Sequence, residues 1–198
     1  MPRSIAKDHA EKRSHILKVA ARIFADQGFA RASMSLVAKE CGTSKANIYH
    51  YYGSKDALLF DILDSYLSSL RDRVLGLPIE DLEPAAQLER VILEFLIAYE
   101  GMDYVHKVQT EGIALLDKDR QEILKNYQRE LVRHLGAVIS KTAPMVFSEE
   151  PDKLRPTVMS VFGMINWFYM WNGSAGRKAR QDYAGFVTKL ALNGVHGL

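Results

Sequence analysis

A short stretch near the N-terminus gathers side chains that could bind nucleic acid. Residues 42–58 read GTSKANIYHYYGSKDAL, with three tyrosines, one histidine and two lysines. Amide and ammonium groups can read base edges, while hydroxyls and cations bind phosphates. If residues 44–50 form a helix, Lys45 and Tyr49 share its outward face, since they are four apart, and Ile48 faces inward. This pattern predicts a DNA-recognition helix.

The chemistry of each side chain predicts its contact with DNA. Asn47 can pair with adenine, Lys45 can reach guanine acceptors, and Ala46 is small enough to touch a thymine methyl group. Phosphate contacts are expected from Tyr49, His50, Lys55 and the N-terminal residue of the preceding helix, Ser33. The predicted DNA-binding residues are Ser33, Thr43, Ser44, Lys45, Ala46, Asn47, Tyr49, His50 and Lys55. Tyr52 is expected to pack inside, whereas Tyr51 is open to either role.

Three helices, two of them short, should position these groups. An apolar stripe predicts a helix from Asp8 to Gly28, with Asp8 as its N-cap and Glu11 in the capping-box position. A second helix should run from the cap Ser33 to residue 41, and a third over residues 44–50. Two short helices joined around Gly42 make a helix-turn-helix, in which the second helix enters the major groove.

The remaining chain also has helical periodicity. A long fourth helix is expected over residues 55–75, with a linker at 76–84 marked by glycine and prolines. Further helical patterns cover residues 84–100, 102–117, 119–142, 153–172 and 178–195, and no alternating strand pattern occurs. The sequence therefore predicts an all-α fold.

Charge separates the two parts of the chain. The 198 residues carry a net charge of +2, but residues 1–55 hold ten Lys or Arg and four acids, or +6, and the remainder is −4. This asymmetry favours an N-terminal nucleic-acid module on a body with another task, although a solvated basic face is the alternative.

Several classes of protein are excluded or disfavoured. No apolar run is long enough for a membrane helix and no signal peptide is evident, so a cytoplasmic protein is expected. The single Cys41 excludes an intramolecular disulfide and suits packing. Asp103 and His106 alone are a weak case for a metal, and no catalytic motif appears, so neither metal, cofactor nor enzyme activity is expected.

The span SMSLVAKECGTSKANIYHYYGSKDALL, from Ser33 to Leu59, resembles the TetR-type (TetR/AcrR) transcriptional regulators. The similarity covers about residues 10–62, with two departures: Tyr52 stands where phenylalanine is usual, and Gly53 where proline or a polar residue is frequent. The resemblance implies a three-helix DNA-binding domain at residues 1–54 and a larger helical ligand-binding and dimerisation domain at 55–198. It further implies a homodimer whose last two helices pair with those of a partner.

The residues support this dimer independently. Helix 153–172 is apolar on every side, so it should be buried all round. One small subunit can cover only one face of such a helix, so a partner chain is expected to cover the other. The last helix adds a second apolar stripe. The predicted interface residues are Met159, Gly163, Asn166, Met170, Tyr183, Phe186, Val187 and Leu190. Packing within one chain is the alternative.

Large aromatic and soft side chains in the body are candidates for a ligand pocket, although core packing is the better explanation for any one of them taken singly. They are Phe95, Tyr99, Met102, Tyr104, His106, Tyr127, Met164, Trp167, Phe168 and Trp171. The stretch NWFYMWNG followed by Arg177, Lys178 and Arg180 loosely resembles regulators that sense acyl-CoA thioesters, because basic groups suit a CoA phosphate.

The leading hypothesis is a repressor that holds an inverted-repeat DNA operator as a dimer and is released by a small apolar or acyl effector. A ligand-free architectural or cell-division DNA-binding factor of the same fold is the main alternative. The third hypothesis is a helical enzyme or carrier whose basic N-terminal region has no role in binding DNA.

Overall fold

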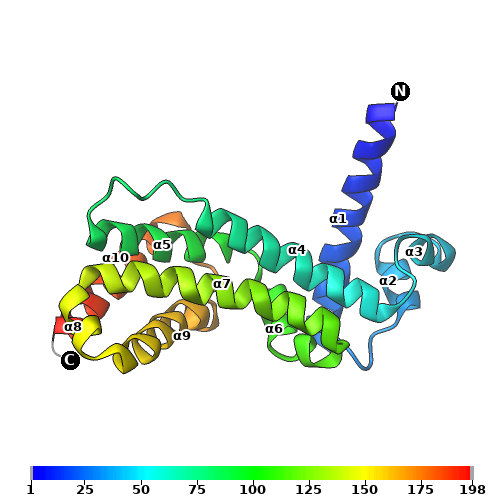
Figure 1. Cartoon of the computed structure of the whole chain (residues 1–198). Helices are drawn as coiled ribbons and strands as arrows, with labels where there is room; N and C mark the ends of the chain where they lie inside the picture. The colour runs from blue at the N-terminus through cyan, green and yellow to red at the C-terminus, as the bar shows by residue number, and fades with distance from the viewer. Residues whose placement is uncertain (1, 197–198) are drawn as a thin grey trace. The chain divides into compact units, whose positions relative to one another are not determined.

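The computed structural model describes the backbone of residues 2–196 and the side chains of residues 9–194. The described residues form helices and no strand, which confirms the all-α prediction (Figure 1). The α-helices are α1 (Pro2–Gln27), α2 (Met34–Glu40), α3 (Lys45–Tyr51), α4 (Lys55–Leu75), α5 (Pro84–Ala98), α6 (Asp103–Gly112), α7 (Lys118–Thr142), α8 (Pro144–Glu149), α9 (Leu154–Asn172) and α10 (Arg177–His196). Two short 3₁₀ turns lie at Ile113–Leu115 and Pro151–Lys153.

Two features of these helices differ from the sequence predictions. Helix α1 begins at Pro2, so the N-cap predicted at Asp8 is wrong. No glycine or proline interrupts residues 3–8, and proline is tolerated in a first helical turn, so nothing stops the helix at Asp8. Helix α8 was not predicted, because six residues are too few to display a helical period.

The chain packs as two compact units. The first contains residues 1–67 and 104–125, and the second contains residues 68–103 and 126–198. Helix α4 thus begins in the first unit and ends in the second. This division by packing differs from the functional division predicted at residues 54 and 55, which stays a prediction.

The first unit is built around the helix-turn-helix. Phe24 of α1, Val37 of α2, Ile48 of α3 and Leu58 of α4 are all buried, with at most 3% of their surface exposed. The turns between these helices use glycines in the left-handed region, Gly28 (φ +79°) and Gly42 (φ +65°), where a side chain would strain the backbone. The hydrophobic face of each short helix is therefore fixed by a shared core.

Helix α6 also packs within the first unit. A Cβ atom added to Gly112 would lie 3.2 Å from Cδ1 of Leu59 and 3.5 Å from Cδ1 of Leu63, so α6 approaches α4 closely at this glycine. His106 of α6 is buried and hydrogen-bonds through Nε2 to the Tyr66 hydroxyl of α4, at 2.8 Å. Packing and this polar contact together join α6 to α4.

The second unit has its own apolar core. Helix α10 packs along α5, and α9 packs against both. Ile92 and Phe95 of α5, Ile165 of α9 and Val187 of α10 are completely buried. None of the described helices is long and apolar enough to cross a membrane.

Candidate nucleic-acid interface

Helix α3 presents a short polar surface on a fixed base. The Ser44 side chain caps the helix by accepting a hydrogen bond from the Asn47 backbone N–H, at 3.1 Å. Lys45, Ala46, Asn47, Tyr49 and His50 are exposed, whereas Ile48 is 0% exposed, as the sequence predicted. The outward face therefore holds one amide, one ammonium, one phenol and one imidazole.

Contacts within α3 organise this face before any partner is present. The Asn47 side-chain N–H group donates to the Thr43 hydroxyl at 2.8 Å, which fixes the amide while leaving its carbonyl oxygen for a base edge. The Lys45 ammonium lies 5.7 Å from the Tyr49 ring centroid, a cation–π contact across one turn. Both contacts reduce the side-chain freedom that would be lost on binding.

Ser33 lies at the start of α2, where a phosphate contact is predicted. Its hydroxyl oxygen accepts from the Leu36 N–H at 3.2 Å, and the residue is exposed. The hydroxyl proton stays available to a phosphate oxygen, and the first turn of a helix attracts anions. This geometry suits the predicted phosphate contact.

Lys55 has a different environment from that of a surface cation. Its ammonium donates to the carbonyl oxygens of Phe29 (2.7 Å), Ala32 (2.9 Å) and Ala30 (3.3 Å), and it lies 4.4 Å from the Phe29 ring centroid. An ammonium has three donors, and all three face the backbone between α1 and α2. Lys55 therefore positions this connection, and a phosphate contact would require it to release a carbonyl.

A polar network that sequence reasoning missed joins α1, α3 and α4. The Asp61 carboxylate of α4 accepts hydrogen bonds from the Arg13 guanidinium of α1 and from the hydroxyl of Tyr52, the C-cap residue that follows α3. Burial and the bond to Asp61 both raise the pKa of Tyr52, so its hydroxyl keeps its proton and donates. Tyr52 is 6% exposed, which confirms that it packs inside. The signal available in the sequence was a tyrosine where the family pattern has phenylalanine.

Two of the ten candidate ligand residues lie in the first unit. Tyr104 is 45% exposed and borders a surface pocket with Arg22 and Glu40. His106 is buried, and burial lowers its pKa to about 4, so the imidazole is neutral at neutral pH. These two residues therefore have different environments, one at the surface and one in the core.

The other eight candidates lie in the second unit and divide between core and surface. Phe95 and Phe168 are buried, and the buried Tyr99 donates its hydroxyl to the Asn166 side-chain oxygen at 2.8 Å. Tyr127 is half-buried beneath the Arg71 guanidinium, whose carbon lies 4.7 Å from the ring centroid. The remaining four are the exposed Met102, Trp167 and Trp171, and the half-buried Met164.

Arg180 lies beneath the surface, although its place in the sequence made it a candidate for a CoA phosphate contact. Only 2% of it is exposed, and its guanidinium donates to the carbonyl oxygens of Leu96 (2.7 Å) and Ala175 (3.1 Å). Leu96 belongs to the last turn of α5, whose carbonyls have no partner within the helix. Arg180 therefore satisfies a helix end, and only Arg177 and Lys178 of this cluster are exposed.

The predicted dimer residues lie mostly on one exposed face of α9 and α10. Met159, Gly163, Asn166, Met170, Phe186 and Leu190 are exposed. Tyr183 is half-buried and donates its hydroxyl to the Met164 carbonyl oxygen at 3.1 Å. Val187 is 0% exposed, so its assignment to an interface with another chain is wrong, because it fills the core of its own unit. Trp167 and Trp171, which were predicted to line a ligand pocket, extend the exposed face instead.

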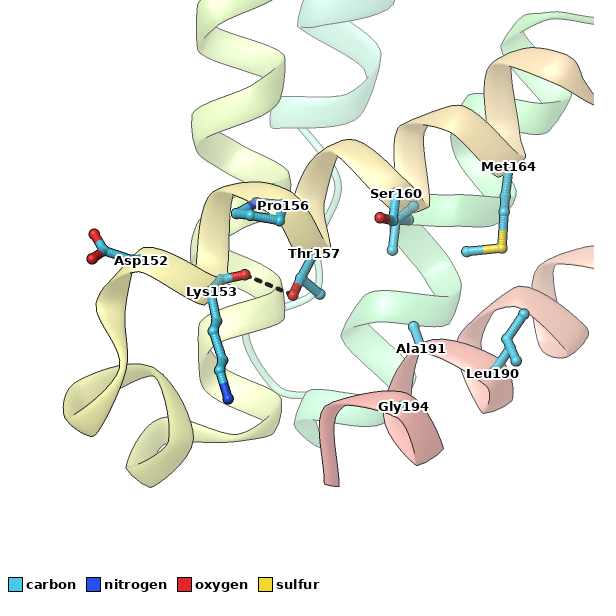
Figure 2. A pocket seen from close by; sticks show the side chains of 10 residues that line it. Asp152, Lys153, Pro156, Thr157, Ser160, Met164, Leu190, Ala191 and Gly194 are labelled. Atoms are coloured by element: carbon cyan, nitrogen blue, oxygen red, sulfur yellow. Dashed lines mark hydrogen bonds between the residues drawn. The ribbon is translucent and has the colours of Figure 1, made fainter. Parts of the chain in front are cut away.

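A hollow lies beside this face, between α9 and α10. It has a volume of about 480 Å³, and Figure 2 shows side chains of both helices around it. Met164 is its only lining residue among the ten candidate ligand residues. Within the part of the chain that the structure describes, no group of three or more His, Cys, Asp or Glu side chains could hold a metal ion.

Comparison with known proteins identifies two regions of the chain. Residues 16–62 match the family model "Bacterial regulatory proteins, tetR family", and residues 81–195 match "Tetracyclin repressor-like, C-terminal domain". A TetR-family transcriptional regulator from Bordetella parapertussis is 30% identical, with 94% of this chain and 96% of that chain covered and a TM-score of 0.84. These matches confirm the resemblance seen in the sequence.

Two further relatives show how far the similarity extends. AibR, solved in complex with isovaleryl coenzyme A and operator DNA, shares the fold at 23% identity, with 90% of this chain and 97% of that chain covered and a TM-score of 0.74. The HTH-type transcriptional regulator YuxN of Bacillus subtilis is 26% identical over 135 residues, 66% of this chain and 45% of YuxN. The match thus spans less than half the length of YuxN, and the same holds for the Bacillus subtilis regulators YerO and PksA.

The relatives are named as transcriptional regulators, in agreement with the absence of a catalytic motif in the sequence. Both family models together cover the helix-turn-helix and the helical body. The chain therefore belongs to the TetR family of bacterial transcriptional regulators.

Proposed function

We propose that this chain is a ligand-responsive repressor that binds an inverted-repeat DNA operator as a homodimer. The observation that carries the proposal is the capped helix α3, with Lys45, Asn47 and Tyr49 exposed above the buried Ile48. The net charge of +6 over residues 1–55 would attract the phosphate backbone. A dimer of such units should read half-sites centred about 34 to 36 Å apart, or a multiple.

Selection from random duplex DNA by the purified chain tests the DNA-binding part of this proposal. The expected result is an inverted repeat, with adenine preferred where Asn47 reaches a base and guanine preferred where Lys45 does. Each phosphate contact should make the slope of log affinity against log salt more negative by about 0.9. Recovery of no enriched sequence, or of single half-sites at all protein concentrations, would contradict the proposal.

We further propose an apolar or acyl effector, with acyl-CoA thioesters as the first class to test. Support comes from the buried aromatic residues Phe95, Tyr99 and Phe168, from the exposed Arg177 and Lys178, and from the isovaleryl coenzyme A bound in AibR. The buried Arg180 does not add to this support, because its guanidinium already bonds to the backbone.

A thermal-shift series with isovaleryl-CoA, isovalerate and free CoA separates the effector classes. A ligand at a hundredfold excess over its dissociation constant stabilises the folded chain by about 2.7 kcal/mol. A rise in melting temperature with the thioester alone supports acyl-CoA sensing, and release of the selected DNA by the same compound supports induction. If neither thioesters nor other apolar compounds bind, the ligand-free architectural alternative replaces this part of the proposal.

A further inference from the structure

We infer that the hollow between α9 and α10 is a socket for the exposed tryptophans of a second copy of this chain. The inference rests on the proposed homodimer and specifies which residues meet within it. It assigns Ser160 opposite Trp167 of the partner subunit, and Pro156 opposite the partner's Trp171.

At one end of the helix pair, the hollow is lined by several small or short side chains, with Asp152 and Lys153 at one edge and the longer Met164 and Leu190 at the other. Its walls include Pro156, Thr157 and Ser160 of α9 and Ala191 and Gly194 of α10, as Figure 2 shows. The Thr157 hydroxyl donates to the Lys153 carbonyl oxygen at 2.8 Å, so this polar group is already satisfied. The site is therefore suited to an apolar occupant.

The largest apolar side chains are exposed at the other end of the same helix pair. Trp167, Met170, Trp171 and Phe186 are each 58% to 63% exposed. The three aromatic residues alone present on the order of 400 Å² of apolar surface, about half of what one partner contributes to an interface of standard size. An apolar patch of this size is typical of a protein interface.

The register of α9 relates the two ends. In the proposed arrangement the two-fold axis crosses α9 at right angles, so each residue lies opposite the residue equally far on the other side of the axis on the partner's α9, and the same surface serves both chains. Ser160 and Trp167, Thr157 and Met170, and Pro156 and Trp171 are all centred between residues 163 and 164. Gly163 is exposed at this centre, and a Cβ atom added to it would meet nothing within 4 Å, so the helices can approach closely there.

Helix α10 gives the same centre independently. Phe168 of α9 stacks on Tyr183 of the antiparallel α10, with ring centroids 4.6 Å apart, so residues 163 and 164 lie level with about residue 187. The exposed Phe186 and the hollow-lining Leu190 are centred on residue 188. Both helices therefore place an aromatic side chain and a wall of the hollow symmetrically about one level.

Charge follows the same symmetry, with a smaller contribution. Glu149 and Asp152 are exposed at the hollow end, and Arg177 is exposed at the aromatic end. A two-fold axis brings these opposite charges toward each other. Arg155 is also exposed at the hollow end, so we assign the recognition mainly to shape.

Tryptophan fluorescence gives a direct readout, because Trp167 and Trp171 are the only two tryptophans in the chain. Dilution of the wild-type chain through its dimer dissociation constant should shift the emission maximum to longer wavelength, as both rings enter water. Sedimentation over the same concentrations gives the oligomeric state independently.

The substitution Ser160→Phe tests the socket by filling it. It should weaken dimerisation about 30-fold or more, as expected when a central aromatic contact is lost. Ser69→Phe is the matched control, because Ser69 is an exposed serine on α4, outside this face. Circular dichroism of both variants checks that the helices are intact.

The double variant Ser160→Phe with Trp167→Ala exchanges the large and small residues of the pair. It should dimerise within about tenfold of the wild-type chain, whereas Trp167→Ala alone should be weakened like Ser160→Phe. Two results would contradict the socket while leaving the dimer: dimerisation of Ser160→Phe with wild-type affinity, or dimerisation of the double variant more weakly than either single variant. A wild-type chain that is monomeric at every concentration overturns both the socket and the proposed dimer.

Discussion

On α3 the exposed side chains are short, polar or cationic, and the large aliphatic Ile48 is completely buried. On α9 and α10 the exposed side chains are the largest apolar ones, among them Trp167, Trp171 and Phe186. The first surface resembles one made for phosphates and base edges, and the second resembles a protein core cut open. The difference indicates that the polar face of α3 is stable in contact with water in a single chain, whereas the apolar face of α9 and α10 is expected to be buried against another protein surface.

The buried Arg180 should contribute strongly to the stability of the second unit, which carries the exposed α9–α10 face. Arg180→Met should destabilise the chain by about 2 to 4 kcal/mol, because the Leu96 and Ala175 carbonyls lose their charged donor. Chemical denaturation measures the free energy of unfolding. Arg177→Met is the control, since an exposed residue without such bonds should change stability by less than about 0.5 kcal/mol. A stable Arg180→Met variant would mean that removal of the buried charge offsets the lost bonds.

His106 should make the stability of the first unit depend on pH. Burial lowers its pKa from 6.5 to about 4, so the unfolded chain takes up this proton at a higher pH than the folded chain. The free energy of unfolding should therefore fall as the pH drops from 6.5 toward 4, by up to about 3 kcal/mol from this group.

The comparison of the wild-type chain with His106→Gln isolates that contribution. Gln can keep a hydrogen bond to Tyr66 but cannot titrate, so the variant should lose this part of the slope. His134, whose pKa burial also lowers, and the carboxylates contribute equally in both proteins. Parallel stability curves between pH 4 and 6.5 would contradict the role assigned to His106.

The outward face of α3 should control DNA binding and leave stability unchanged. Lys45→Ala combined with Tyr49→Ala should weaken binding to the selected operator about 100-fold, because the variant loses both a base contact and a phosphate contact. The melting temperature should stay within about 2 °C of the wild-type value, since both residues are exposed. Unchanged operator affinity would instead favour the enzyme or carrier hypothesis.

The Tyr52 hydroxyl should have the smallest effect of the four. Tyr52→Phe removes its bond to Asp61 and leaves the ring, at a cost of about 1 kcal/mol in stability. Operator affinity should fall about threefold to tenfold, since the C-terminal end of α3 is then held less firmly. A double-mutant cycle with Asp61→Asn should show coupling, because both changes affect one network. Additive effects would show that Tyr52 and Asp61 act separately.

The sequence by itself determined the all-α fold, the helix-turn-helix and its exposed residues. These depend on local rules: Ser33 and Ser44 are suited to helix caps, Gly28 and Gly42 to left-handed turns, and Ile48 must face inward on a seven-residue helix. The whole recognition surface lies within about 25 consecutive residues, so helical periodicity was enough to orient it.

Only the tertiary structure determined the burial and the contacts of side chains whose neighbours come from distant segments. It buried Val187 and Arg180, engaged the Lys55 ammonium with three carbonyls, and exposed Trp167 and Trp171. An apolar residue on a helix can face its own core, a ligand or a partner, and composition does not distinguish these, because burial depends on which helices pack beside it.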